Sequence, residues 1–152
     1  TGLPNVGPDD WVLVHDAARC LVRSEAIEAL IAACLQHQRG GLLAQPLADT
    51  LKVAQVNAKG VESVATTLPR EGRWLAQTPQ MFPLVALRKA LENASAQPAD
   101  WQAITDEASA MERLGVSPIL IPGGADNFKV TYPSDFAMAH AILAQRAQKD
   151  IL

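Results

Sequence analysis

The chain has little cysteine, few aromatic residues and no long apolar run. Only two cysteines occur in its 152 residues, Cys20 and Cys34, and they are not spaced as CxxC. A disulfide framework or a structural zinc site is therefore not expected. The low cysteine content fits a reducing cytosol, so we expect a cytoplasmic protein. Because no apolar run reaches membrane-spanning length, we also expect no membrane partner.

Charge is scarce as well, at 19% of the residues, and the formal net charge is −3. Nucleic-acid-binding domains usually carry a basic surface, so this balance argues against a nucleic-acid partner. It still allows small anionic ligands, because a few lysine and arginine side chains can hold a phosphate group on an acidic protein. With 49% apolar residues, the chain is expected to form one domain over residues 1–152.

The first residues read as a loop. Residues 1–8 contain two glycines and two prolines and open on Thr1 rather than on methionine. A chain that starts in a loop and then enters a buried strand suggests a cut through a larger protein. We therefore expect an N-terminally truncated domain.

Strand and helix patterns alternate along the chain. An apolar run at 11–15 and a second one at 41–47 are typical of buried strands, and between them apolar residues recur at helical spacing after Ser24. This order predicts a crossover unit. Further strands are expected at 74–77, 117–121 and 128–130, and further helices at 83–94, 106–114 and 135–148. The alternation predicts an α/β sheet with helices on both faces.

A β-hairpin is predicted between the second and third of these strands. Residues 51–56 and 61–67 alternate in hydropathy, and a turn at 57–60 ends on Gly60. An isolated two-stranded hairpin is marginal in water. We therefore interpret residues of about 50–70 as an arm that needs external support, and we favour a dimer contact over packing on its own domain.

Candidate ligand residues follow the predicted strands, since α/β folds bind ligands beyond the carboxyl ends of their strands. Asp16 and Arg19 directly follow the first strand, and they could bind ligand hydroxyls and a phosphate. The alternative is a structural ion pair. Lys129 lies between Phe128 and Val130 and could contact a phosphate, or it could extend along the surface into solvent.

Other polar residues have simpler readings. Thr50 and Arg70 bracket the hairpin and are most simply surface residues, as Thr78 is most simply part of a turn. Asp106 and Glu107 open a helix, where acidic side chains offset the helix dipole. His15 is expected to be a hydrogen-bonded histidine at a strand end. The GxGxxG and GxxxxGK[ST] phosphate-loop motifs are both absent.

Five segments taken together resemble a known family. They are VHDAAR at 14–19, DTLK at 49–52, LAQTPQMF at 75–82, TDEASA at 105–110 and DNFKVTYPSD at 126–135. In this order the chain resembles the 2-C-methyl-D-erythritol 4-phosphate cytidylyltransferases of the bacterial non-mevalonate isoprenoid pathway. The resemblance implies a Rossmann-like, mostly parallel sheet and a homodimer in which each hairpin arm reaches into the neighbouring subunit's site.

The resemblance also implies roles for individual residues. Asp16 and Arg19 would bind the methylerythritol phosphate, with Thr78 and Lys129 in the same site and Arg19 and Lys129 acting in catalysis. Thr50 and Arg70 would come from the partner subunit. One departure is Cys20, where the family usually has proline, and a small geometric change is expected there.

The implied activity is transfer of CMP from CTP to methylerythritol phosphate, with release of pyrophosphate. Mg²⁺ would bind mainly through CTP phosphate oxygens, and no protein ligand is assigned to it. The family's N-terminal strand and glycine-rich loop, which hold CTP, have no counterpart here, so weak or no activity is expected of this chain alone. Alternatives are a cytidylyltransferase for another polyol phosphate, such as ribitol 5-phosphate, and a non-catalytic dimerisation fragment.

Overall fold

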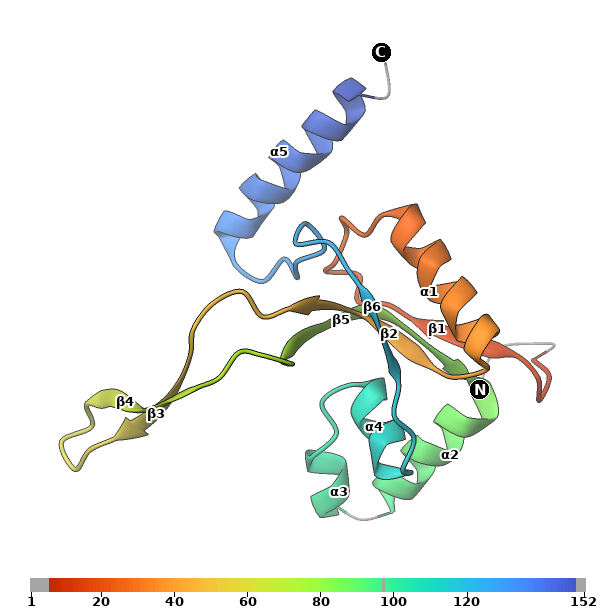
Figure 1. Ribbon diagram of the computed structural model, residues 1–152, viewed down its shortest axis with the longest axis horizontal. Helices are drawn as coiled ribbons and strands as arrows, with labels where there is room; N and C mark the ends of the chain where they lie inside the picture. The colour runs from red at the N-terminus through yellow and green to blue at the C-terminus, as the bar shows by residue number, and fades with distance from the viewer. Residues whose placement is uncertain (1–5, 97, 150–152) are drawn as a thin grey trace.

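The computed structural model describes residues 6–96 and 98–149, so part of the predicted loop at 1–8 lies outside the described residues. The described residues form a central four-stranded sheet of order β1-β5-β2-β6 and a separate two-stranded sheet, β3-β4 (Figure 1). The strands are β1 Trp11–Val14, β2 Gly41–Pro46, β3 Leu51–Val56, β4 Glu62–Leu68, β5 Trp74–Pro83 and β6 Ile119–Pro122. The helices are α1 Ser24–His37, α2 Leu84–Ser95, α3 Pro98–Gln102, α4 Glu107–Arg113 and α5 Pro133–Lys149.

The sheet is mixed rather than mostly parallel. Strands β2 and β6 pair in parallel, but β5 lies between β1 and β2 and is antiparallel to both. The predicted crossover unit therefore keeps β1 and β2 in the same direction without making them neighbours. The sequence pattern could not show this, because β5 comes later in the chain and is inserted between them.

Helices cover both faces of the sheet, as predicted. Leu42 and Phe82 point to the face that α2 and α4 cover, where they pack with Met111. Leu43 and Met81, one residue away along each strand, pack on the other face against α1. This alternation of adjacent side chains between two faces is the normal consequence of the strand's two-residue period. The core is therefore two layers of apolar contacts with the sheet between them.

Strand β5 continues past the point where the sequence indicated its end. The strand was expected at 74–77, but it runs from Trp74 to Pro83. Between the paired positions Leu42↔Gln80 and Ala44↔Ala76, β5 has two more residues than β2. Pro79 lies in this irregular stretch, where the ladder does not need the backbone N–H that proline lacks. The same stretch carries Thr78 out of the regular pairing.

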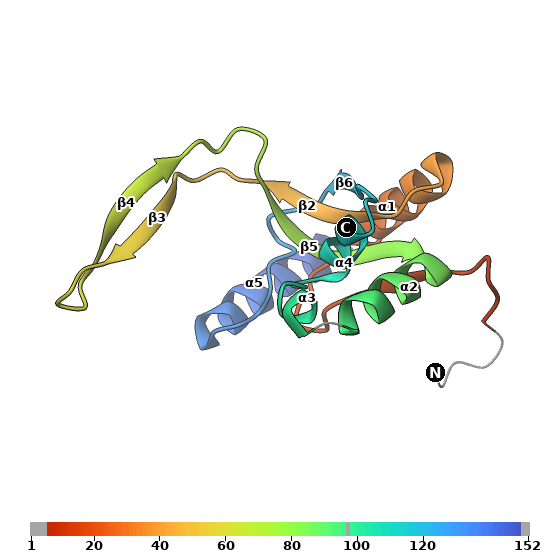
Figure 2. The ribbon, with the colours of Figure 1, turned by 90° about the horizontal axis from the view of Figure 1, so that it is seen from below.

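The hairpin is present as predicted and projects away from the central sheet (Figures 1 and 2). Strands β3 and β4 are exposed along their whole length except at Leu68. Val56, Val61 and Val64 are each more than half exposed. We call residues 51–68 the arm. It makes its own ladder, and neither of its strands pairs with the central sheet.

The C-terminal part contains one wrong prediction and one confirmed one. Residues 128–130 are not a strand but part of a loop between β6 and α5. The helix expected at 135–148 is present as α5, which begins at Pro133, and proline suits the first turn of a helix. Its side chains are mostly exposed, and Ala139 is buried. No helix in the parts of the chain at 6–96 and 98–149 has the length and apolar character needed to span a membrane.

Candidate active site

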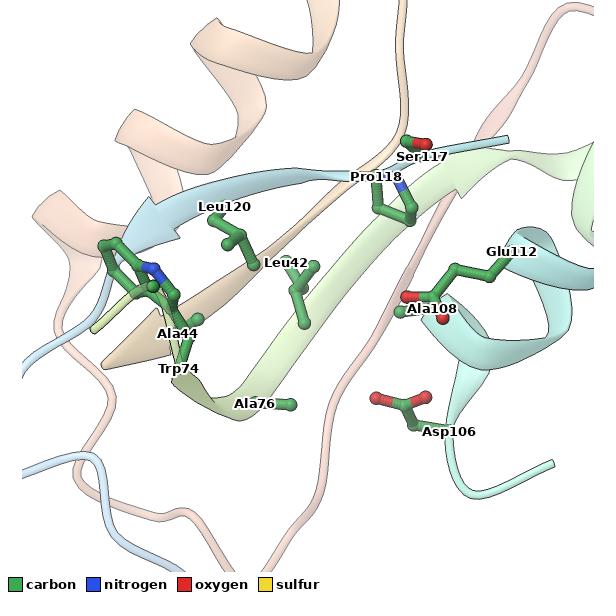
Figure 3. A pocket seen from close by; sticks show the side chains of 11 residues that line it. Leu42, Ala44, Trp74, Ala76, Asp106, Ala108, Glu112, Ser117, Pro118 and Leu120 are labelled. Carbon is green, nitrogen blue, oxygen red and sulfur yellow. The ribbon is translucent and has the colours of Figure 1, made fainter. Parts of the chain in front are cut away.

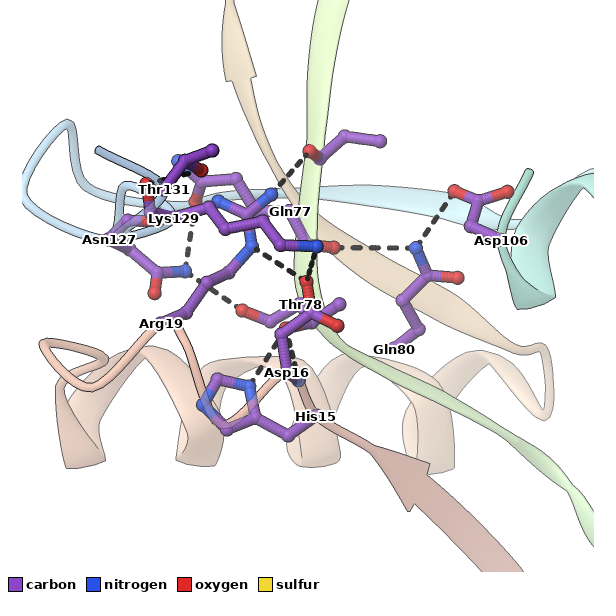
Figure 4. Close-up of polar contacts among 11 residues, drawn as sticks. His15, Asp16, Arg19, Gln77, Thr78, Gln80, Asp106, Asn127, Lys129 and Thr131 are labelled. Atoms are coloured by element: carbon purple, nitrogen blue, oxygen red, sulfur yellow. Dashed lines mark hydrogen bonds and ion pairs between the residues drawn. The ribbon is translucent and has the colours of Figure 1, made fainter.

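A pocket of about 380 Å³ lies beyond the ends of the central strands. Four segments meet there: the turn after β1, the irregular stretch of β5, the loop between β6 and α5, and the segment that leads into α4 (Figure 4). We call it the strand-end pocket. Its lining residues are Asp16, Arg19, Ala76, Gln77, Thr78, Gln80, Thr105, Asp106, Glu107 and Lys129. The structure thus brings together Asp16, Arg19, Thr78 and Lys129, four of the six residues selected from the sequence.

The carboxylate of Asp16 lies between two cations. Its Oδ2 is 3.1 Å from Lys129 Nζ and 3.7 Å from Arg19 Nε. Two positive charges and one negative charge leave this side of the pocket with an excess of one positive charge. An anionic group on this side would meet both cations. Lys129 is about half exposed and is held by its ion pair with Asp16, and Asp106 and Glu107 add negative charge elsewhere in the lining.

Arg19 is fixed more firmly than Lys129. Its Nη1 donates to the carbonyl oxygen of Asn127 at 2.9 Å, and its Nη2 to that of Ala76 at 3.4 Å. Burial lowers the pKa of Arg19, and the neighbouring charge of Asp16 partly offsets this effect. The guanidinium still carries its charge at neutral pH, because arginine does not lose its proton in proteins. Arg19 is therefore a positioned cation, hydrogen-bonded to β5 and to the loop between β6 and α5.

The loop that carries Lys129 is attached to β5 by amide side chains. Asn127 Nδ2 donates to Thr78 O at 2.9 Å and to Gln77 Oε1 at 3.1 Å, and Gln77 Nε2 donates to Gly124 O at 3.1 Å. A Cβ at Gly123 would lie 2.1 Å from Gln77 Oε1, so a side chain there would displace Gln77. Sequence reasoning missed Gln77 and Asn127 as structural residues. The only feature of the sequence that could have identified them is their position within the segments 75–82 and 126–135.

The same loop is held from outside by a cluster of charges. Arg146 of α5 and Arg23 of the segment before α1 place their Nη2 atoms 2.7 Å and 2.8 Å from Asp126 Oδ2. Arg146 also donates to the carbonyl oxygen of Leu21 at 2.8 Å. Burial raises the pKa of Asp126, but hydrogen bonds from Arg146 and Arg23 together outweigh it, so the pKa lies below its usual value. The C-terminal helix is thus connected to the pocket loop.

The opposite wall of the pocket is built around the start of α4. Asp106 caps this helix, because its Oδ1 accepts the N–H of Ser109 at 2.9 Å. Its Oδ2 accepts a hydrogen bond from Gln80 Nε2 at 2.9 Å, and Gln80 Oε1 accepts the N–H of Ala108 at 2.8 Å. Asp106 therefore has a structural role at the helix start, as the hydrogen-bonded cap of α4. The compensation of the helix dipole expected of Asp106 and Glu107 stays a prediction. Gln80 is 1% exposed and was not selected from the sequence.

His15 and Thr78 form a hydrogen-bonded pair at the end of β1. Thr78 Oγ1 lies 2.9 Å from His15 Nδ1 and accepts the backbone N–H of Asp16, also at 2.9 Å. The expectation of a hydrogen-bonded strand-end histidine is confirmed. Thr78 is 8% exposed, so its hydroxyl belongs to the interior of the pocket rather than to an ordinary surface turn.

Thr50 and Arg70 do not line the strand-end pocket. Both are exposed at the base of the arm, and the guanidinium of Arg70 donates to the carbonyl oxygen of Ala48. Within one chain the arm extends away from the body (Figure 2). These two residues therefore remain outside the pocket of their own chain.

A second cavity of about 360 Å³ adjoins the pocket on the α4 side of the sheet (Figure 3). Leu42, Ala44 and Leu120 form an apolar floor, and Trp74 and Glu112 stand at its sides. Asp106 lines both spaces and so belongs to the wall between them. The sequence reasoning did not anticipate this cavity, because its lining comes from strands and a helix far apart in the chain.

The described residues contain no group of three or more His, Cys, Asp and Glu side chains that could hold a metal ion. Cys34 is buried, and burial raises the pKa of its thiol to about 11. Its thiolate is therefore scarce at neutral pH.

The mixed sheet with helices on both faces places the chain in the class of α/β proteins. The sequence profile of one family, IspD, 2-C-methyl-D-erythritol 4-phosphate cytidylyltransferase, matches residues 1–145. The chain belongs to this family.

Individual relatives agree with this assignment. A 2-C-methyl-D-erythritol 4-phosphate cytidylyltransferase of Chromobacterium violaceum is 57% identical over 138 residues, which are 91% of this chain and 57% of the relative. A bifunctional enzyme IspD/IspF of Albidiferax ferrireducens is 55% identical over 141 residues, which are 93% of this chain and 31% of the relative. The chain therefore spans less than two thirds of the length of these relatives.

The fold agrees as well. The crystal structure of the 2-C-methyl-D-erythritol 4-phosphate cytidylyltransferase of Francisella tularensis matches with a TM-score of 0.79 and 36% identity. The match covers 91% of this chain and 62% of that one. A crystal structure of 4-diphosphocytidyl-2C-methyl-D-erythritol synthase matches with a TM-score of 0.77 and 44% identity, over 90% of this chain and 58% of that one.

Proposed function

We propose that this chain provides the acceptor-binding part of an enzyme that transfers CMP from CTP to 2-C-methyl-D-erythritol 4-phosphate in isoprenoid precursor biosynthesis. The observation that carries the proposal is the meeting of Asp16, Arg19, Thr78 and Lys129 in one pocket of a chain of this family. A cytoplasmic location and the absence of a nucleic-acid partner stay predictions from the composition.

The charges of the pocket suit a polyol phosphate. Lys129 and Arg19 offer N–H donors to a phosphate group. Asp16 and Glu107 offer carboxylate oxygens, which accept hydrogen bonds from ligand hydroxyls. A molecule with a phosphate at one end and hydroxyls along its chain matches this division better than a purely anionic or purely neutral ligand.

The proposed reaction needs no general base on the protein. The second pKa of a phosphate monoester is about 6, so the acceptor phosphate is largely a dianion at neutral pH. One of its oxygens forms a bond to the α-phosphorus of CTP, and the bond from that phosphorus to the bridging oxygen breaks to release pyrophosphate. Arg19 and Lys129 would align the acceptor and offset the crowded negative charge.

We infer that Mg²⁺ takes part through the phosphate oxygens of CTP, since this ion usually binds with substrate phosphates and few carboxylates. When bound, it would supply further neutralisation of the triphosphate charge. No residue of this chain is assigned to it.

We further propose that the arm completes the pocket of a second subunit in a homodimer. Its valines are exposed in the single chain, and Thr50 and Arg70 stand at its base without reaching their own pocket. An exposed two-stranded hairpin gains stability when another surface covers its apolar side chains. In the dimer, Thr50 and Arg70 would contribute to the neighbour's acceptor site.

Isothermal titration calorimetry with two acceptors tests the proposed substrate. We expect this chain to bind methylerythritol phosphate at least about tenfold more tightly than ribitol 5-phosphate, which is a difference of about 1.4 kcal/mol. The reverse order would favour the alternative acceptor. No heat with either acceptor, together with a dimer in sedimentation, would favour the non-catalytic dimerisation fragment.

Sedimentation velocity of two matched variants tests the arm. Val64→Asp places a charge on the arm and is expected to convert the dimer to monomer. Val85→Asp is the control, because Val85 lies on α2 and is 53% exposed, close to the 58% of Val64. A dimer that survives Val64→Asp, or a wild-type monomer, would contradict the proposed role of the arm.

A further inference from the structure

The hydroxyl group of Thr78 has two hydrogen-bond partners, and it cannot have the same role, donor or acceptor, toward every group around it. Its Oγ1 lies 2.9 Å from the backbone nitrogen of Asp16 and 2.9 Å from Nδ1 of His15 (Figure 4). A hydroxyl has one hydrogen to donate and two lone pairs that accept. The N–H of Asp16 can only donate, so it occupies one lone pair. Whether the Thr78 hydroxyl has its hydrogen or a lone pair left for a ligand therefore depends on His15.

Two arrangements are possible. If His15 carries a proton on Nδ1, this proton fills the second lone pair of Thr78, and the hydroxyl hydrogen is free to point into the pocket. If Nδ1 is bare, the hydroxyl hydrogen is used to reach it, and Thr78 keeps one lone pair for a ligand. One proton on His15 thus decides whether Thr78 is a donor or an acceptor toward the pocket.

The two cations that line the pocket with Thr78 favour the first arrangement. Lys129 and Arg19 line the pocket together with Thr78 and offer donors to the phosphate of the proposed acceptor, whereas Asp16, Asp106 and Glu107 in the same lining suit its hydroxyls. Phosphate oxygens accept hydrogen bonds and need donors around them. A hydroxyl that donates can form a hydrogen bond with a phosphate oxygen, whereas a hydroxyl that can only accept would place a lone pair against it.

We propose that His15 holds a proton on Nδ1 and thereby directs the hydroxyl hydrogen of Thr78 toward the phosphate of the acceptor. His15 is a positioning residue in this proposal, which rests on the proposed acceptor. Its ring is exposed, so water can serve its Nε2. Nδ1, which faces the Thr78 hydroxyl, is the ring nitrogen whose protonation decides the direction of that hydrogen bond.

Nuclear magnetic resonance of ¹⁵N-histidine-labelled protein tests the proton directly. The chain has three histidines, His15, His37 and His140, and a His15→Asn variant identifies the signals of His15 by their loss. We expect a protonated, pyrrole-type Nδ1 for His15, with or without ligand. A bare, pyridine-type Nδ1 would overturn the proposal. This readout needs no substrate, so it stands apart from the proposed function.

Substitutions test the consequence for binding, with methylerythritol phosphate as the titrant. His15→Asn can still offer an N–H to Thr78 and is expected to bind within about threefold of wild type. His15→Asp offers only acceptor oxygens and is expected to weaken binding about tenfold or more, the order of one hydrogen bond to a charged group. Equal affinities of the Asp and Asn variants would contradict the proposal.

A double-mutant cycle separates this role from simple charge repulsion. In a Thr78→Val background, His15→Asp should have an effect of less than about threefold, because the hydroxyl through which His15 acts is gone. An undiminished tenfold effect would show that His15 acts independently of Thr78, and the proposal would fail. If wild type itself bound no acceptor, the proposed function would fail, and the state of Nδ1 would still decide the hydrogen-bond assignment.

Discussion

In the body of the protein, residues from four segments surround one pocket, whereas in the arm two strands are exposed with Thr50 and Arg70 at their base. Arg19, Asn127 and Gln77 connect segments that are 47–108 residues apart in the chain. The arm has a ladder between neighbouring strands and little else. The difference teaches that one half of the proposed acceptor site is preorganised within the chain, while the other half needs a partner to position it.

The largest expected effect is on the stability of the body. Phe82→Ala removes a ring that is 0% exposed and packs on the α2 and α4 face. We expect a loss of about 3–5 kcal/mol in the free energy of unfolding, as is usual for a buried aromatic residue. Urea denaturation followed by circular dichroism measures it. A loss below about 1 kcal/mol would contradict the contrast between a packed body and an exposed arm.

The next effect concerns ligand binding in the body. Lys129→Met removes a cation whose side chain is 54% exposed, so the fold should be little affected. Affinity for methylerythritol phosphate is expected to fall about 10- to 100-fold, because a hydrogen bond from a charged group to the phosphate is lost. Calorimetry measures this, with Lys89→Met on α2 as the control. Unchanged affinity would remove Lys129 from the proposed site.

A smaller effect is expected for the charge cluster that ties α5 to the pocket loop. Asp126→Asn weakens contacts with Arg23 and Arg146 and should cost roughly 1–2 kcal/mol near neutral pH. The folded pKa of Asp126 lies below the unfolded value of about 3.9. The ionised carboxylate of Asp126 therefore stabilises the fold fully at pH values above the unfolded pKa. This stabilisation is lost as the pH falls through the folded pKa.

Thermal melting at a series of pH values measures this difference. The difference in melting temperature between wild type and Asp126→Asn should be largest near neutral pH and should become smaller below about pH 4. Glu62→Gln in the exposed arm is the control and should show no comparable gap. A gap that stays constant down to low pH would mean that the substitution acts through packing rather than through charge.

The smallest effect is expected in the arm. Val64→Ala should change the free energy of unfolding of the single chain by less than about 0.5 kcal/mol, because Val64 is 58% exposed there. The measurement is made at protein concentrations where sedimentation shows monomer. A larger loss under those conditions would mean that the arm packs on its own body in solution.

The sequence predicted most of the central elements because distinct apolar runs form them, although only β2 is mostly buried and β1, expected to be buried, is only partly so. Residues 11–15 and 41–47 became β1 and β2, and the alternating stretches of the arm became β3 and β4. The order of the sheet was not predictable in the same way. No local pattern shows that β5 lies between two strands that precede it, so the sheet was expected to be more parallel than it is.

The candidate site was predicted only in part, because local motifs identify some of its residues but not the contacts between distant segments. Motif residues at strand ends identified Asp16, Arg19, Thr78 and Lys129, which the fold brings together. Lys129 was nevertheless expected on a strand, because Phe128 and Val130 flank it. In the structure this segment is a loop, held by the hydrogen bond from Val130 N to Ala18 O at 2.8 Å. Contacts across more than a hundred residues leave no trace in local hydropathy.

The wall formed by Gln80 and Asp106 has a practical consequence for redesign. Both oxygens of Asp106 are committed, one to the start of α4 and one to Gln80, so a change there would disturb a helix as well as a pocket. Thr105 and Glu107, on either side of it, line the same space, and their side chains make no hydrogen bond or ion pair with other described residues. Libraries aimed at a new acceptor should therefore vary these two neighbours and keep the aspartate between them.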